Sequence, residues 1–236
     1  MIASVKQTEV IMAFYQSPVI EVEITPSIPV PSGGIYEYWE GSEEVERKML
    51  ESEVNSIFTD EEQAVLWKCL NDKVEDWVNS GLDKVIRRRM TTATPEMLYR
   101  GVNRRMLNVL QNVDVGEVFT AERVVSFSTD FNTARSFASF GCYGTKTVIR
   151  WSNPTIAYNY QEDMLKILAA APNCEFSAAP YDPLAKIDRK NKINMVQDEQ
   201  EWMMPIGTKF RVTSIEDVDF NPGGMHTIYD VELISF

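Results

Sequence analysis

The chain has 236 residues, of which 44% are hydrophobic and 25% are charged, the composition of a globular protein with a substantial core. Its 35 acidic residues outnumber 23 lysines and arginines and give a net charge of −12, so the long-range field repels nucleic acid and anionic membranes. One histidine (His226) and three widely spaced cysteines (Cys69, Cys142 and Cys174) argue against a disulfide framework, a zinc site and most mechanisms that pair a nucleophile with a histidine base.

The apolar runs and the start of the chain predict the compartment. No apolar run approaches the ~20 residues needed to span a bilayer. Residues 1–6 carry no basic region that leads into a long apolar stretch, so no signal peptide is expected. Together with the spacing of the cysteines, these features predict a protein of a reducing cytosol.

The first forty residues are expected to form an extension. Residues 19–24 alternate apolar and acidic side chains, which is typical of a strand. Residues 25–34 contain three prolines and two glycines, which interrupt helices and central strands and indicate a linker. We therefore expect residues 1–40 to lie outside the main domain.

Residues 42–89 have the apolar periodicity of helices. Thr59 and Glu62 form a capping box, in which each side chain accepts a hydrogen bond from the backbone of the other. Gly81 is the expected end of a helix. The predicted buried stripe consists of Leu66, Leu70, Val74, Trp77 and Val78. Three consecutive arginines at 87–89 would suit nucleic acid, but we favour a basic helix C-terminus that complements the dipole.

After Pro95 the pattern changes to strands with short helices between them. Strands are expected at residues 97–101, 116–119, 123–129, 145–151, 155–160, 199–204, 209–215 and 226–234. Helices are expected at 103–111, after a cap at Asp130 or Asn132, and at 163–171, before Pro172. Residues 172–198 are predicted to be irregular, with a small basic group at Arg189, Lys190 and Lys192.

Polar residues stand at the ends of two predicted strands. Arg100 and Gly101 close the strand at 97–101. They are either an exposed strand end and a turn, or a planar cation that binds an anion beside a glycine that lets the backbone approach a ligand. Ser126 and Ser128 lie near the end of a later predicted strand, just before a short helix.

Glu199 and Glu201 form a Glu-x-Glu pair of carboxylates near the C-terminal part of the chain. On an extended segment they share one face, while Trp202 and Met204 face a core on the other side. An isolated pair of this kind is most often a solvated strand face. Taken in order with the arginine and the serines upstream, it indicates a catalytic cleft.

These motifs, in this order, resemble the arginine-specific mono-ADP-ribosyltransferases, which place an arginine, a Ser-x-Ser and a Glu-x-Glu around NAD. The chain is more narrowly similar to the Mod-type enzymes of T-even bacteriophages, from about residue 50 to the C-terminus. The stretches that carry this similarity are residues 58–63, 66–67, 98–101, 115–119 and 199–207. Phe127 stands where many relatives have threonine, a departure that leaves the serine positions intact.

The resemblance implies a role for each site residue. Arg100 would contact the NAD phosphates, and the backbone of Gly101 would hold the nicotinamide carboxamide. Ser126 would orient Glu201 and the nicotinamide ribose, with help from Ser128 or Thr129. Glu201 would bind the ribose and stabilise the oxocarbenium-like cation that forms as nicotinamide leaves.

Glu199 would bind the acceptor arginine and orient or deprotonate its attacking nitrogen. Residues 186–198 would select the protein target. NAD is then the substrate, and the reaction requires no metal.

The implied fold is α+β, with a mixed or antiparallel β-sandwich core. Residues 41–236 would form the ADP-ribosyltransferase domain, helical at 41–93 and β-rich at 94–236. The expected function is modification of arginines on host proteins in the bacterial cytoplasm, with translation or RNA-binding proteins as targets. The resemblance also allows transfer of NAD-capped RNA. The alternatives are an NAD glycohydrolase and a non-catalytic module that binds a host protein.

Overall fold

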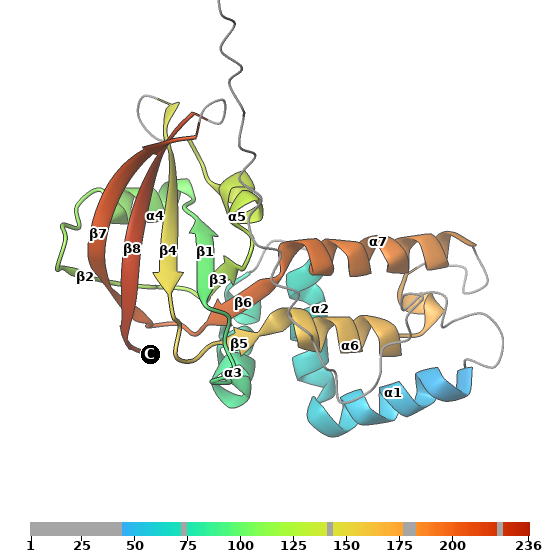
Figure 1. Ribbon diagram of the computed structural model, residues 1–236. Coiled ribbons are helices and arrows are strands. Elements are labelled where there is room, and N and C mark those ends of the chain that lie inside the picture. The colour runs from blue at the N-terminus through green and yellow to red at the C-terminus, as the bar shows by residue number, and fades with distance from the viewer. Residues whose placement is uncertain (1–43, 72–74, 141–143, 177–182, 221–223) are drawn as a thin grey trace, which may run out of the picture.

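The structure is a computed structural model that describes residues 44–71, 75–140, 144–176, 183–220 and 224–236 (Figure 1). The helices in these ranges are α1 (Glu44–Ile57), α2 (Asp60–Asn71), α3 (Asp76–Arg89), α4 (Arg104–Leu110), α5 (Phe131–Phe137), α6 (Tyr160–Ala170), η3 (Asn173–Glu175) and α7 (Pro183–Glu199). The strands are β1 (Met97–Gly101), β2 (Val118–Thr120), β3 (Val125–Ser128), β4 (Lys146–Ser152), β5 (Tyr158–Asn159), β6 (Glu201–Met204), β7 (Lys209–Asp219) and β8 (Met225–Ser235). The expected extension at 1–40 lies outside the described residues.

The strands form one eight-stranded sheet in the order β2-β7-β8-β4-β1-β3-β6-β5. Neighbours pair antiparallel except β4 and β8, which are parallel. The α+β class and the mixed, mostly antiparallel sheet are therefore confirmed. The strand expected at 155–160 is shorter than predicted, because α6 begins at Tyr160.

The sheet curls so that strands distant in its order face each other. Phe127 on β3 and Phe210 on β7 are four steps apart in the strand order, yet their ring centroids are 5.8 Å apart. Trp151 on β4 packs between them, 5.6 Å from Phe127 and 5.3 Å from Phe210. The expected sandwich is thus made from one continuous sheet that encloses an aromatic core.

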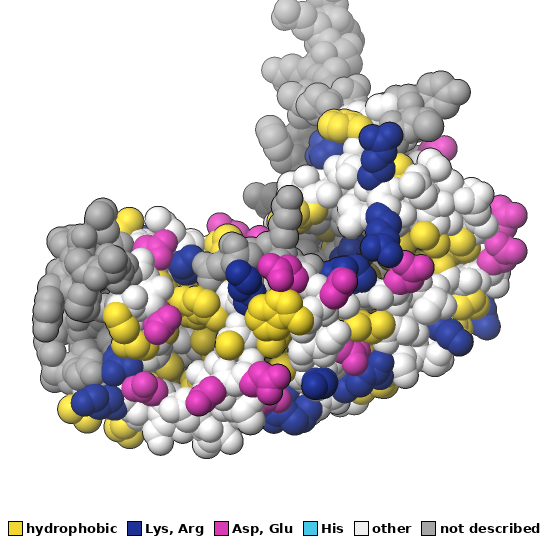
Figure 2. All heavy atoms as spheres, turned by 180° about the vertical axis from the view of Figure 1, so that it is seen from behind, with side chains coloured by type: hydrophobic (Ala, Val, Ile, Leu, Met, Phe, Trp, Pro, Cys, Tyr) yellow, Lys and Arg dark blue, Asp and Glu magenta, His cyan; other side chains and the backbone are white. Residues whose placement is uncertain are grey.

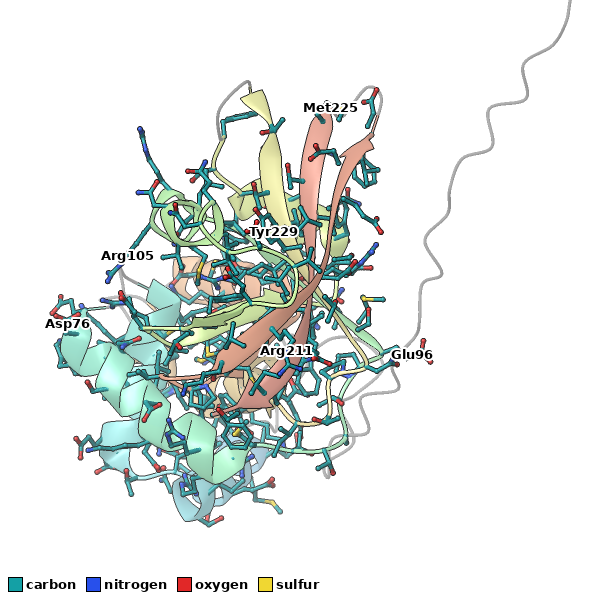
Figure 3. All side chains as sticks on the ribbon, turned by 90° about the vertical axis from the view of Figure 1, so that its left-hand side faces the viewer. Asp76, Glu96, Arg105, Arg211, Met225 and Tyr229 are labelled. Carbon is teal, nitrogen blue, oxygen red and sulfur yellow. The ribbon has the colours of Figure 1, made fainter. Side chains whose placement is uncertain are left out.

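Helix α4 packs against this enclosed core. Leu107 and Leu110 of α4 are buried in the same cluster as Tyr229 of β8, whose hydroxyl donates to the Leu110 carbonyl at 3.4 Å. Figure 3 shows Tyr229 beside α4, with Arg105 pointing outward from the helix and Met225 at the far tip of β8. The tyrosine therefore links the sheet to the helix that covers it.

The helical layer lies on the other side of β5 and β6 (Figure 1). Met203 packs into a core made by α1, α2, α3 and α6, whereas Trp202 and Met204 pack into the aromatic core of the sheet. The alternation along β6 thus buries both of its faces. The prediction that Trp202 and Met204 face a core is confirmed.

Local sequence signals explain the helix ends. The Thr59 amide donates to Glu62 Oε2 at 2.9 Å and the Glu62 amide donates to Thr59 Oγ1 at 3.2 Å, which confirms the capping box. The arginines at 87–89 end α3 and pair with Asp83, Glu62 and Asp163, as expected of a helix terminus and not of a nucleic-acid patch.

Three predictions about the helical segments are wrong. Gly81 lies inside α3, where an added Cβ would be 2.6 Å from Val65 Cγ2 of α2, so close helix packing explains the glycine. Residues 172–198 are not irregular throughout, because α7 runs from Pro183 to Glu199. Trp77 is also not part of a buried stripe, since it is 53% exposed, and Val74 lies outside the described residues.

Among the described helices, none combines the length and the apolar character that a bilayer span needs. On the face in Figure 2, acidic and basic side chains are interspersed across the helical half. The net negative charge is therefore not gathered into a single patch on that face.

A buried ion pair ties the helical layer together behind β6. Arg89 of α3 donates to both carboxylate oxygens of Asp163 in α6, at 2.8 and 2.6 Å, and the Asp163 side chain is only 2% exposed. Removing one partner would leave the other charge poorly compensated in the interior.

We therefore expect Asp163→Asn to lower the free energy of unfolding by about 2–3 kcal/mol, at or below the usual range for a broken buried pair because Arg89 is partly exposed. Denaturant unfolding measures this change. Asp76→Asn is the control, because the Asp76 side chain is 97% exposed and its pair with Arg123 should contribute little. Equal midpoints for the two variants would show that the buried pair has no special role.

Candidate active site

Three adjacent strands bring the sequence motifs together. The sheet order β1-β3-β6 places the ends of the motif strands side by side, with Tyr99 opposite Ser128 and Ser128 opposite Glu201. Two strand pairings, between residues 29 and 73 positions apart in the chain, therefore create the site.

Arg100 is a residue of β1, and its side chain contacts the neighbouring strand β3. Its Nη1 donates to the Ser126 carbonyl at 2.7 Å, while its buried Nε has no hydrogen-bond partner. Burial lowers the pKa of the guanidinium, and the nearby Glu201 carboxylate opposes that shift. A buried donor without a partner is costly in a folded protein, so this atom suits an anionic ligand such as a phosphate.

Gly101 has a structural explanation. An added Cβ would lie 1.9 Å from the Ala134 carbonyl oxygen and 2.6 Å from the Ala138 amide nitrogen of the α5 segment. The glycine is thus required for α5 to pack on β1. Its expected contact with nicotinamide remains a prediction.

Glu201 is the first residue of β6, and its carboxyl group is the strongly perturbed acid of the site. Burial raises its pKa to about 7. A hydrogen bond with the Ser126 side chain and the positive charge of Arg100 both oppose this rise, while Glu199 adds to it. The carboxyl group therefore changes its protonation state near neutral pH.

The two serines differ in their contacts. The Ser126 side chain lies beside Glu201 and lowers the pKa of its carboxyl group, while its expected role in orienting Glu201 stays a prediction. Ser128 is buried, and its Oγ accepts from the Asp130 amide at 3.0 Å, where Asp130 caps α5. Ser128 thus supports the start of α5, and its expected help in binding NAD stays a prediction.

Glu199 does not lie on the strand as expected. It is the last residue of α7, and Gln200 takes a left-handed conformation (φ 46°) before β6 begins at Glu201. A contact between the Thr129 hydroxyl and the Gln200 side-chain oxygen holds this junction against β3. The helix end still brings the Glu199 charge near Glu201, although by a turn and not by strand alternation.

Two residues that the sequence did not indicate lie behind Glu201. The antiparallel register of β5 and β6 pairs Asn159 with Trp202, so Tyr160 follows opposite Glu201. Tyr160 is 2% exposed and hydrogen-bonds Cys69, whose thiol pKa burial raises to about 12, with a further contribution from Glu201. The position of Tyr160 and Cys69 next to Glu201 follows from the strand register, which the sequence does not specify.

An open pocket of about 400 Å³ lies between α5 and α7 and reaches Glu199. Burial raises the pKa of Glu199, and the charge of Asp198 raises it further. Within the ranges that the structure describes, no three histidine, cysteine, aspartate or glutamate side chains are grouped as a metal site would require.

Comparison with known proteins identifies the family. The sequence profile of the bacteriophage T4 Mod ADP-ribosyltransferases matches residues 40–236. The NAD–protein ADP-ribosyltransferase modB of enterobacteria phage T4 is 36% identical over 180 residues, which cover 75% of this chain and 84% of that protein. The enzyme modA of the same phage is 31% identical over 176 residues, covering 73% and 80%.

Solved structures with a similar chain path include two bacterial toxins. Plx2a, an ADP-ribosyltransferase toxin from Paenibacillus larvae, is 13% identical with a TM-score of 0.42, covering 81% of this chain and 94% of that one. The Vis toxin of Vibrio splendidus is 17% identical with a TM-score of 0.37, covering 83% and 87%. On the sequence matches, the chain belongs to the bacteriophage T4 Mod ADP-ribosyltransferase family and is an NAD–protein ADP-ribosyltransferase.

Proposed function

We propose that this enzyme transfers ADP-ribose from NAD to arginine side chains of host proteins in the bacterial cytoplasm. The observation that carries the proposal is the grouping of Arg100, Ser126 and Glu201 on three adjacent strands, with Glu199 beside them. A module that only binds proteins has no physical need for a partly buried acid beside a partly buried guanidinium.

Arg100 is the residue best suited to hold NAD. Its Nε is buried and lacks a partner, so a phosphate oxygen of the dinucleotide would satisfy it. NAD supplies the reactive bond itself, because neutral nicotinamide is a good leaving group from the charged pyridinium. The residues of this chain then need to hold the dinucleotide and stabilise the charge that develops.

Glu201 would provide that stabilisation. As the bond between nicotinamide and ribose breaks, its electron pair leaves with nicotinamide and positive charge develops on the ribose. An ionised carboxylate that Ser126 already orients would stabilise this charge without reorganising. The low polarity of its surroundings, including the buried Tyr160, strengthens the interaction.

Glu199 would bind the acceptor arginine. A guanidinium nitrogen forms the new bond to the ribose carbon and releases one proton, for which the carboxylate of Glu199 is the nearby base. Burial and Asp198 raise the pKa of Glu199, which makes it a better proton acceptor. Hydrolysis of NAD has no use for this group, so its presence favours transfer over the glycohydrolase alternative.

The resemblance to Mod-type enzymes supports the choice of targets. Translation or RNA-binding proteins are the proposed acceptors, and NAD-capped RNA is a further proposed donor. The negative net charge disfavours tight non-specific RNA binding.

We expect Glu201→Gln to reduce both nicotinamide release and transfer by about 10²–10³-fold, because one preorganised charge is lost from the transition state. Purified enzyme with labelled NAD and agmatine as a small guanidine acceptor measures both. Glu232→Gln, which alters a surface pair with Arg211, is the control and should behave as wild type. Transfer by the Glu201 variant near the wild-type rate would contradict the assignment.

Glu199→Ala is expected to separate the two activities. Transfer to agmatine should be lost while some nicotinamide release persists, because water needs no carboxylate to position it as the guanidinium does. The measurement is the ratio of ADP-ribosylated agmatine to released nicotinamide. Loss of both activities in equal proportion would contradict the proposed division of roles.

The pH dependence follows from the raised pKa of Glu201. The acid acts when ionised, so kcat/KM for nicotinamide release should rise with pH, reach half of its plateau near pH 7 and level off about one unit higher. In Ser126→Ala the hydrogen bond that lowers this pKa is lost, and the rise should move to higher pH. A shift to lower pH, or no shift, would show that Ser126 does not act on Glu201.

A further inference from the structure

The inner side of Glu201 faces the helical layer. Glu201 and Met203 share one face of β6, because side chains alternate along a strand, and Met203 is buried in the core made by α1, α2, α3 and α6. Tyr160 begins α6 directly after β5 and stands opposite Glu201 in the strand register. The partly exposed carboxyl group is therefore bordered on its inner side by the helical core.

Tyr160 is held at this border by contacts of its ring and of its hydroxyl. The buried ring makes an edge contact with the ring of Tyr158, and the two centroids are 6.5 Å apart. The hydroxyl donates to the Leu66 carbonyl of α2 at 3.4 Å and hydrogen-bonds the thiol of Cys69, about one turn further along the same helix. The place of the tyrosine beside β6 is thus set by a helix from the N-terminal part of the chain (Figure 1).

Glu201, Cys69 and Tyr160 influence one another's protonation. Burial is the largest cause of the raised pKa of Glu201, and the Glu201 charge in turn contributes to the raised pKa values of Cys69 and Tyr160. Charges act on the pKa of a neighbour in this way at close range. Burial raises the pKa of Cys69 to about 12 and that of Tyr160 well above its ordinary value, so both side chains are uncharged at neutral pH.

We propose that Tyr160, held by Leu66 and Cys69 of α2, is a positioning residue that keeps water away from the inner side of Glu201. The inference rests on the proposed role of Glu201 and gives the helical part of the chain a share in catalysis. An ionised carboxylate attracts a developing positive charge more strongly where water does not screen it. Tyr160 acts through Glu201 and exchanges no proton, because its hydroxyl is bound to α2 and its pKa is raised.

The pH dependence of nicotinamide release tests this role. Tyr160→Ala leaves a cavity bordered by the Leu66 carbonyl, the Cys69 thiol and the Glu201 carboxyl group, and a cavity with several polar partners takes up water. Water stabilises the ionised carboxylate, so the pH at which kcat/KM reaches half of its plateau should fall by about one unit relative to wild type. The plateau should fall as well, because water screens the carboxylate.

Two further variants make the measurement decisive. Tyr160→Leu leaves a smaller cavity than Tyr160→Ala, so its half-plateau pH should fall by less, and it keeps more of the packing if the alanine variant does not fold. Tyr229→Ala is the matched control, because Tyr229 is a buried tyrosine in the aromatic core, four steps from β6 in the strand order. It should lower the free energy of unfolding and leave the half-plateau pH unchanged. Thermal unfolding of each variant shows which ones are folded.

The direction of the shift separates the possible results. A lower half-plateau pH in a folded Tyr160 variant, with Tyr229→Ala unchanged, supports the proposed role. An unchanged half-plateau pH would overturn it and leave Tyr160 a packing residue, with the role of Glu201 intact. A shift to higher pH, the direction expected for Ser126→Ala, would overturn it as well. Wild-type activity of Glu201→Gln would instead overturn the proposed role of Glu201, and the role of Tyr160 with it.

Discussion

Burial of the Glu201 carboxyl group is the constraint on which the site depends. A carboxylate inside a protein is unfavourable unless hydrogen bonds and opposite charge compensate it, and here Ser126 and Arg100 do so in part. The remaining imbalance holds the pKa near 7. A ligand that develops positive charge would stabilise the ionised Glu201 carboxylate further. The same arrangement is therefore unfavourable without the ligand and useful in catalysis.

The fold meets this constraint through long-range pairing. Strands β1, β3 and β6 lie side by side only because the sheet order departs from the chain order. The helical core closes the back of β6, where Tyr160 and Met203 exclude water. The left-handed Gln200 turns the chain from α7 into β6, so one short junction delivers Glu199 and Glu201 to the same cleft.

Local signals in the sequence predicted much of this. The capping box at Thr59 and Glu62, a helix cap at Asp130 or Asn132 and the strand at 97–101 depend on neighbours a few residues away. All are present in the structure, where Asp130 is the cap. The order of the motifs was enough to indicate the family. The contact between Ser126 and Glu201 followed from that resemblance and not from any local pattern.

Features fixed by distant contacts could not be predicted. Helix α7 has few apolar residues, and one of its buried residues is the charged Arg189. Its apolar periodicity is therefore weak, and the sequence pattern favours a strand at Glu199 instead of the helix end that the structure has. Gly81 looked like a helix end because its reason, contact with Val65, lies on another helix. The curl of the sheet and the pocket between α5 and α7 likewise exist only after elements far apart in sequence have packed.

Mass spectrometry of a bacterial lysate incubated with NAD and the enzyme, beside a lysate without the enzyme, tests the central claim most directly. The account predicts ADP-ribose on arginine side chains of discrete proteins only when the enzyme is present. Attachment to other residue types, or release of nicotinamide with no modified arginine, would contradict it.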